Sequence, residues 1–154
     1  MPISLPARNQ IKAKRPARQS VGYLMRYGYR AFAKAISAEL HPFQISSGQW
    51  SVLRVLWEEE GLSQVELAER MRVEKASLTG VLDAMDKHGL IARARNTRDR
   101  RKVNIHLTAR ARKLKDKLLP FGTLINKRAT KGMSQSEVET LRRLLTQVID
   151  NLDA

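Results

Sequence analysis

Apolar residues recur at intervals of three and four positions over most of the chain, which is the period of an amphipathic helix. The first such stretch runs from Ser20 to Leu40 and a second from Ser47 through Trp57. The same spacing predicts four further helices, over about 64–73, 74–88, 109–125 and 135–152. The pattern therefore predicts a mainly helical chain.

Local polar residues mark where these helices begin. Ser47 is the expected N-cap of the second helix. Ser63 and Glu66 have the S-x-x-E spacing of a capping box, and Leu62 and Leu67 have the spacing of the hydrophobic staple that accompanies one. A second capping box is predicted over 134–137.

Proline and glycine mark where helices end. Pro42 follows the first helix, Gly61 the second, and Gly89 stands at the expected C′ position of the helix over 74–88. Pro120 and Gly122 fall inside the long helix capped by Thr108, and we expect them to kink or break it.

After Gly89 the period of the apolar pattern changes from 3.6 to two. Residues 91–95 and 103–107 alternate as paired strands do, and residues 96–102 form a basic hairpin tip between them. Two short helices joined by a tight turn and followed by a hairpin predict a winged helix-turn-helix over about 47–108.

Charge is unevenly distributed along the chain, and its location indicates which kind of partner the protein binds. The 154 residues carry a formal net charge of +14, which points to a polyanion and first to nucleic acid. Residues 92–102 hold six bases and one acid, whereas residues 58–74 hold six acids and two bases. Residues 1–19 hold five bases, no acid and three prolines, which predicts a flexible basic arm before a single domain over 20–154.

Composition also excludes several classes of function. The chain has no cysteine, so disulfides, thiolate metal sites and thiol catalysis are excluded. His41, His88 and His106 are scattered, so we expect no metal and no cofactor. Phosphate-binding glycine motifs and nucleophile–base patterns are missing, which predicts no catalytic residues and a protein that is not an enzyme. Without an apolar span or a signal peptide, we expect a cytoplasmic protein with no membrane association.

Two surfaces, a small polar helix face and a basic hairpin tip, are candidates for binding double-stranded DNA. On the helix over 74–88, the face opposite the apolar stripe is small and polar and includes Gly80 in mid-helix, which suits close approach to a groove. At the hairpin, arginines crowd a tip where the negative potential of a narrow minor groove would attract them, and Asp99 is read as their internal counter-ion. A solvated helix face and a solvated basic turn are the alternatives. The candidate DNA-binding residues are Lys75, Ala76, Ser77, Thr79, Gly80, Arg95, Arg98, Arg100, Arg101 and Lys102.

Three stretches of this sequence resemble the MarR family of bacterial transcription regulators. Residues 63–70 look like the first helix of its helix-turn-helix, and residues 76–91 look like its recognition helix with the turn into the wing. Residues 96–101, followed by 105–108, are similar to its wing signature, D-x-R-D-x-R…I-x-L-T. Asn96 replaces the first aspartate of that signature, and we expect this change to loosen the tip.

The resemblance implies a homodimer whose N- and C-terminal helices, about 20–40 and 109–152, intertwine. It implies that Arg101 is the wing arginine, that Asp99 organises it, and that the dimer binds near-palindromic DNA with half-sites about one helical turn apart. The seam expected to face the partner consists of Val138, Leu141, Leu145, Val148 and Leu152.

Many members of the family release DNA when a small ligand binds between the dimer helices and the DNA-binding lobe. Aromatic rings beside arginines suit an aromatic carboxylate or an acyl-CoA, although the same rings also suit the core of a dimer interface. The candidate ligand residues are Tyr23, Arg26, Tyr27, His41, Trp50 and Arg54. The predicted function is a ligand-responsive repressor; the alternative is an architectural or counter-silencing DNA-binding protein, an activator without a dedicated ligand.

Overall fold

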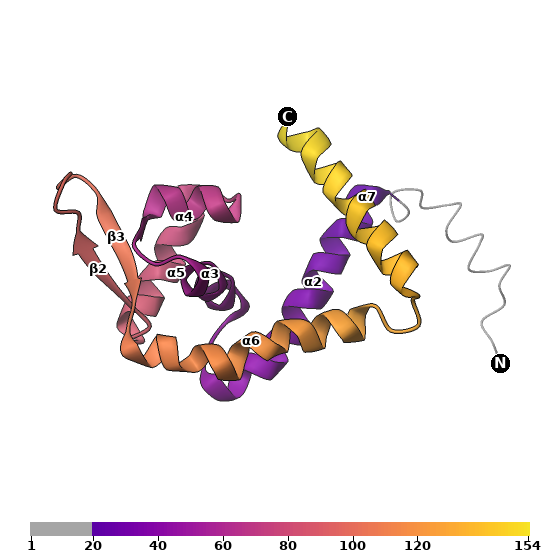
Figure 1. Ribbon diagram of the computed structural model, residues 1–154, viewed down its shortest axis with the longest axis horizontal. Helices are drawn as coiled ribbons and strands as arrows, with labels where there is room; N and C mark the ends of the chain where they lie inside the picture. The colour runs from indigo at the N-terminus through magenta and orange to yellow at the C-terminus, as the bar shows by residue number, and fades with distance from the viewer. Residues whose placement is uncertain (1–19) are drawn as a thin grey trace, which may run out of the picture.

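The computed structural model describes residues 20–154, which form a helical chain with a small sheet at one end (Figure 1). The elements are α2 (Val21–Leu40), η2 (His41–Phe43), α3 (Ser47–Glu58), β1 (Leu62–Ser63), α4 (Gln64–Met71), α5 (Lys75–Lys87), β2 (Ile91–Arg95), β3 (Val103–Leu107), α6 (Ala109–Ala129) and α7 (Gln135–Asp153). The predicted fold class, mainly α with a β-hairpin wing in a winged helix-turn-helix, is confirmed. The predicted basic arm over 1–19 lies outside the described residues.

The sheet contains one strand more than the sequence predicts. Its order is β1-β3-β2, with both pairs antiparallel, and Ile91 lies opposite Leu107 at the base of the hairpin. The additional strand β1 is two residues long and places Leu62 opposite Ile105. A strand of this length has no periodicity to detect, so only the tertiary pairing reveals it.

Three capping boxes begin helices within residues 20–154, and two of them are those predicted. Ser63 Oγ accepts from the backbone N–H of Glu66 at 3.2 Å, and the Glu66 carboxylate accepts from the Ser63 N–H at 3.1 Å. The box over 134–137 begins α7 in the same way. The predicted cap Ser47 is wrong: Ser46 caps α3, because Ser46 has extended backbone and has Gln49 three positions further on to complete the box.

The sequence predicts a kink or break of α6 at Pro120 and Gly122; the helix is continuous from Ala109 to Ala129, so the break does not occur. Pro120 removes one backbone donor from the helix. Leu118, two residues before Pro120, and Ile125, five residues after it, are both buried in the core and hold the two halves of the helix against it. This packing keeps the helix intact across the proline.

The hydrophobic core is centred on α3, whose Val52, Leu53 and Leu56 are fully buried. Trp57 lies at the edge of this core, and its indole N–H donates to the backbone oxygen of Ala111 at 3.0 Å. Around α3 pack Leu40 of α2, Leu67 of α4, Leu82 and Met85 of α5, Ile105 of β3 and Leu118 of α6. One core therefore fixes α5 and the hairpin relative to each other.

Glu60 joins three elements in the loop after α3. Its carboxylate accepts from the backbone N–H of Leu107 at 2.8 Å and from both Nη2 and Nε of Arg112, at 2.8 and 3.0 Å. The hydrogen bonds from Arg112, followed by the bond from Leu107, hold the pKa of Glu60 below its ordinary value, against the opposing effect of burial. The base of the wing and the start of α6 are thus tied to the end of α3.

We expect Glu60→Gln to lower the free energy of unfolding by about 1 kcal/mol near neutral pH, because the bidentate charged bond is lost. Since the folded-state pKa of Glu60 is lowered, its contribution is present above the ordinary pKa of 4.5 and is lost as pH falls through the folded-state value. Urea denaturation at neutral and acidic pH should therefore show a difference between variant and parent that shrinks in acid. The control is Glu59→Gln, which removes the exposed ion pair with Arg70 and should change stability by less than about 0.5 kcal/mol.

Candidate nucleic-acid interface

Helix α5 presents a small polar face to solvent. Leu78, Leu82 and Met85 are buried against the core. The five candidate residues on this helix, Lys75, Ala76, Ser77, Thr79 and Gly80, are all exposed. A Cβ on Gly80 would have no neighbour within 4 Å, so the surface there is open. The first two turns of α5 can therefore approach a flat or concave surface closely.

The acidic residues of α5 are neutralised by the wing. Arg93 of β2 forms ion pairs with Asp83 at 2.8 Å and with Asp86 at 3.7 Å. The negative charge of Asp83 would repel a phosphate, and the ion pair with Arg93 compensates it within the molecule. Sequence analysis missed the role of Arg93. The available signal was its place two residues after buried Ile91, on the strand face that turns toward α5.

The wing tip is organised by one carboxylate. Asp99 accepts from Nε and Nη2 of Arg101 at 3.1 and 3.2 Å, and also from the Arg101 backbone N–H at 3.1 Å. The side-chain bonds from Arg101, followed by its backbone bond, hold the pKa of Asp99 below its ordinary value. The bonds to Asp99 orient the Arg101 guanidinium. The side chain is nevertheless 90% exposed, so the guanidinium remains accessible.

Asn96 bonds to the backbone of the wing tip. Its side-chain oxygen accepts from the backbone N–H groups of Arg98 and Asp99 at 2.8 and 3.1 Å. Backbone bonds between Asn96 and Lys102 and between Lys102 and Asp99 close the turn. An amide oxygen can accept the same bonds as a carboxylate oxygen, so the turn keeps these contacts with asparagine at this position.

The start of α5 and the wing meet around one hollow of about 380 Å³. Lys75 lines it from α5, and Arg101 and Lys102 line it from the wing. Its remaining lining residues are Ser63, Gln64, Val65, Glu66, Glu69 and Val103. Arg95 and Arg98 line a separate hollow of about 460 Å³ along the wing, and Arg100 is exposed at the tip.

The six candidate ligand residues fall into two groups. Trp50 and Arg54 lie together on α3, with the guanidinium 5.9 Å from the indole centroid. The other four residues are not among those that line the two pockets described next. Of these four, Tyr23 and Tyr27 stack on α2 with their ring centroids 4.3 Å apart, whereas Arg26 on α2 and His41 in η2 are exposed.

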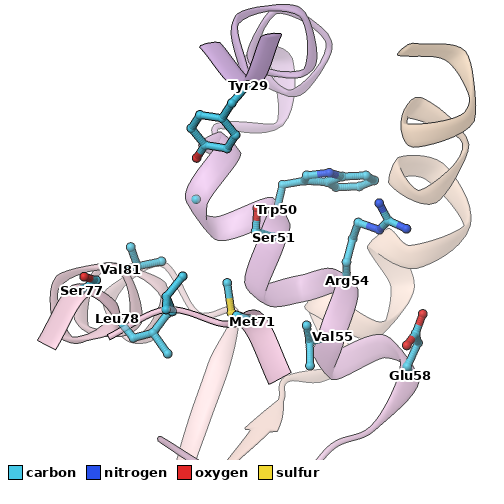
Figure 2. A pocket seen from close by; sticks show the side chains of 12 residues that line it. Tyr29, Trp50, Ser51, Arg54, Val55, Glu58, Met71, Ser77, Leu78 and Val81 are labelled. Atoms are coloured by element: carbon cyan, nitrogen blue, oxygen red, sulfur yellow. The ribbon is translucent and has the colours of Figure 1, made fainter. Parts of the chain in front are cut away.

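Trp50 and Arg54 line two adjoining pockets. The larger, of about 580 Å³, lies between α2, α3 and α5 (Figure 2). The smaller, of about 160 Å³, reaches Gly122 and Ile125 of α6. Figure 2 shows Tyr29 of α2 above the larger pocket and Ser77, Leu78 and Val81 of α5 at its opposite side. Tyr29 is a residue that the sequence analysis missed, because its neighbours come from distant helices.

The predicted seam of α7 is unburied. No residue of α7 is buried, and Leu141, Leu145 and Leu152 are 38%, 37% and 80% exposed. Val138 and Val148 are half-buried. Helix α2 also exposes apolar residues, including Leu24 and Phe32.

Two further observations concern residues 20–154. No group of three or more histidine, aspartate or glutamate side chains lies together as a metal site would require. None of the helices here combines the length and the apolar character needed to cross a bilayer.

Comparison with known proteins identifies the family. The sequence profile of the MarR family matches residues 45–103. The organic hydroperoxide resistance transcriptional regulator of Bacillus subtilis is 31% identical over 123 residues, which cover 79% of this chain and 80% of that protein. The chain belongs to the MarR family.

Other relatives of this MarR-family chain agree with that assignment. The HTH-type transcriptional regulator TtmR of Methylorubrum extorquens is 40% identical over 124 residues, and the match covers 80% of this chain but only 63% of TtmR. Among solved structures, Bordetella bronchiseptica BpsR aligns with a TM-score of 0.79 at 25% identity, covering 86% of this chain and 95% of that one. The BpsR structure is described as a mechanism for regulation of its DNA binding by 6-hydroxynicotinic acid.

Proposed function

We propose that this MarR-family chain is a sequence-specific, DNA-binding transcription regulator, a repressor that binds a near-palindromic operator as a homodimer. The observation that carries the proposal is the shared hollow, where the exposed start of α5 meets Arg101 and Lys102 of the wing. An α-helix fits the major groove of B-DNA, and the adjacent minor groove attracts arginine. The small face around Ala76 and Gly80 supports close approach of α5 to base edges.

The exposed apolar seam supports the homodimer. Leu141, Leu145 and Leu152 of α7 are exposed at helical spacing, and Leu24 and Phe32 add apolar surface on α2. A helix that buries none of its own residues needs a further partner surface to stabilise it. A second copy would supply that surface and would present two wings to the two halves of a palindrome.

The pockets at Trp50 and Arg54 support a small effector. An indole face beside a guanidinium suits an aromatic carboxylate or an acyl-CoA, because the ring stacks and the anion pairs with arginine. The larger pocket is also lined by Ser77, Leu78 and Val81 of α5, so an occupant would contact the recognition helix directly. The description of BpsR, a relative regulated by an aromatic acid, supports the same class of effector.

Arg101→Ala should weaken binding to the preferred operator by about 1–3 kcal/mol, since one groove contact is lost. Fluorescence anisotropy with a duplex selected from a random pool measures the loss. Arg128→Ala is the control, because it removes an equal charge at the far end of α6, where Arg128 pairs with Glu39. Equal affinity of the Arg101 variant and the parent would refute the wing assignment. Footprints that coat DNA with little sequence preference would instead support the architectural alternative.

Val148→Asp should convert the dimer to monomer, because it places a carboxylate within the apolar seam at a cost of several kcal/mol. Sedimentation velocity at micromolar concentration distinguishes the two states. Gln147→Asp adds the same charge one position off the seam and should leave the dimer intact. If the Val148 variant remains a dimer that binds DNA, α7 does not form the interface.

An effector of the proposed class should raise the melting temperature by several degrees at saturating concentration and should release the operator. Thermal-shift measurements with a panel of aromatic acids and their CoA thioesters identify it. Arg54→Met keeps the aliphatic stem and should abolish the shift, whereas Arg26→Met on α2 should preserve it. A shift that survives in the Arg54 variant would place the effector elsewhere.

A further inference from the structure

Gln64 connects the two helices of the helix-turn-helix through a side-chain bridge. It is the first residue of α4. Its amide Nε2 donates to the backbone oxygen of Lys75 at 3.2 Å and to the hydroxyl oxygen of Thr79 at 3.1 Å. Both acceptors belong to the first two turns of α5, so the bridge holds the part of α5 that faces the DNA in the proposed complex.

The two bonds together establish that Gln64 donates to Thr79 and not the reverse. A backbone carbonyl only accepts hydrogen bonds, so its contact with Gln64 requires the NH₂ group of the amide on that side. The same NH₂ group therefore donates to Thr79, whose oxygen acts as acceptor. Among the described residues the hydroxyl forms no second bond, so its own hydrogen is available for an atom outside the protein.

Thr79 lies beside the proposed DNA site. The residue is exposed. Gln64 and Lys75, its neighbours in the bridge, line the hollow shared with Arg101 and Lys102. DNA offers acceptors in such a place, both as phosphate oxygens and as purine N7, guanine O6 or thymine O4 on base edges.

We infer that Gln64 is a positioning residue that presets Thr79 as a hydrogen-bond donor to an acceptor atom of DNA. The inference rests on the proposed DNA-binding function and adds to it the polarity of one contact. A hydroxyl with no partner offers one hydrogen and two lone pairs, whereas this one has one lone pair occupied by Gln64 and keeps its hydrogen, which favours an acceptor atom as its next partner. Because the Gln64 bond holds the Thr79 hydroxyl oxygen in place before binding, the contact requires less ordering when DNA arrives.

A double-mutant cycle tests the inference on a duplex that the parent protein selects from a random pool. Thr79→Val removes the donor and should weaken binding by about 3- to 10-fold. Gln64→Glu replaces the amide by an acceptor, which draws the hydroxyl hydrogen inward and turns oxygen lone pairs toward the DNA. This variant should lose at least as much affinity as Thr79→Val. The factor by which the double variant loses affinity should be at least about 3-fold smaller than the product of the factors for the two single variants.

The chain supplies a matched control for the change at Gln64. Gln135 holds the same position after the capping serine of α7, in a second Ser-Gln-x-Glu box. Gln135→Glu therefore adds the same charge at the same helical position, away from Lys75 and Thr79, and should leave operator affinity within about 2-fold of the parent. Thr79→Ser keeps the hydroxyl and should restore most of the affinity lost in Thr79→Val. Thermal denaturation of each variant verifies that folding is unchanged.

The outcomes distinguish a phosphate oxygen from a base edge as the acceptor. They also distinguish failure of the inference from failure of the proposed function. Uniform loss by Thr79→Val over all sequences assigns a phosphate oxygen, and relaxed preference at one base pair per half-site assigns a base edge; both support the inference. If the losses of the two single variants simply multiply, or if Thr79→Val binds like the parent, Gln64 does not act through Thr79 and the inference is overturned. If the parent enriches no sequence from the pool, the proposed function falls, and the inference with it.

Discussion

Repulsion between like charges is the constraint that shapes this molecule. A hairpin with six bases and one acid would splay apart in isolation, and a net charge of +14 opposes compaction of the whole chain. The chain compensates part of this charge with ion pairs between carboxylates and arginines. Asp99 holds Arg101 at the wing tip, Asp83 holds Arg93 between the wing and α5, and Glu60 holds Arg112 at the wing base. Each pair is weak at the surface, yet together they set the shape of the basic surface before any polyanion is present.

Most of what is local was predictable from the sequence. The capping boxes, the alternation of the hairpin and the apolar stripe of α5 depend on neighbours within four residues, and they gave the order of elements and the candidate wing. The Ser46–Gln49 box was equally local and was missed only because an adjacent serine competed for the same role. The family resemblance added the roles of Arg101 and Asp99, which spacing alone left open.

What the sequence could not provide depends on register and on packing between distant segments. The pairing of Arg93 with Asp83 requires knowing which face of β2 turns toward α5. The pocket at Trp50 and Arg54 collects side chains from α2, α3 and α5, so Tyr29 could not be assigned to it in advance. Pro120 was read from propensity as a break, whereas burial of Leu118 and Ile125 on either side overrides that propensity. In each case tertiary contact, rather than local preference, decides the outcome.

The unbroken course of α6 has a mechanical consequence. Its 21 residues run from the base of the wing toward α7 (Figure 1), a length of about 31 Å at 1.5 Å per residue. In the proposed dimer this helix would act as a lever with its fulcrum near the subunit interface. A rotation of about 6° there would displace the wing base by about 3 Å, close to the spacing of successive base pairs. A proline that broke the helix would absorb that rotation, so in such a dimer the continuity of α6 would make the separation of the two wings sensitive to small changes at the interface.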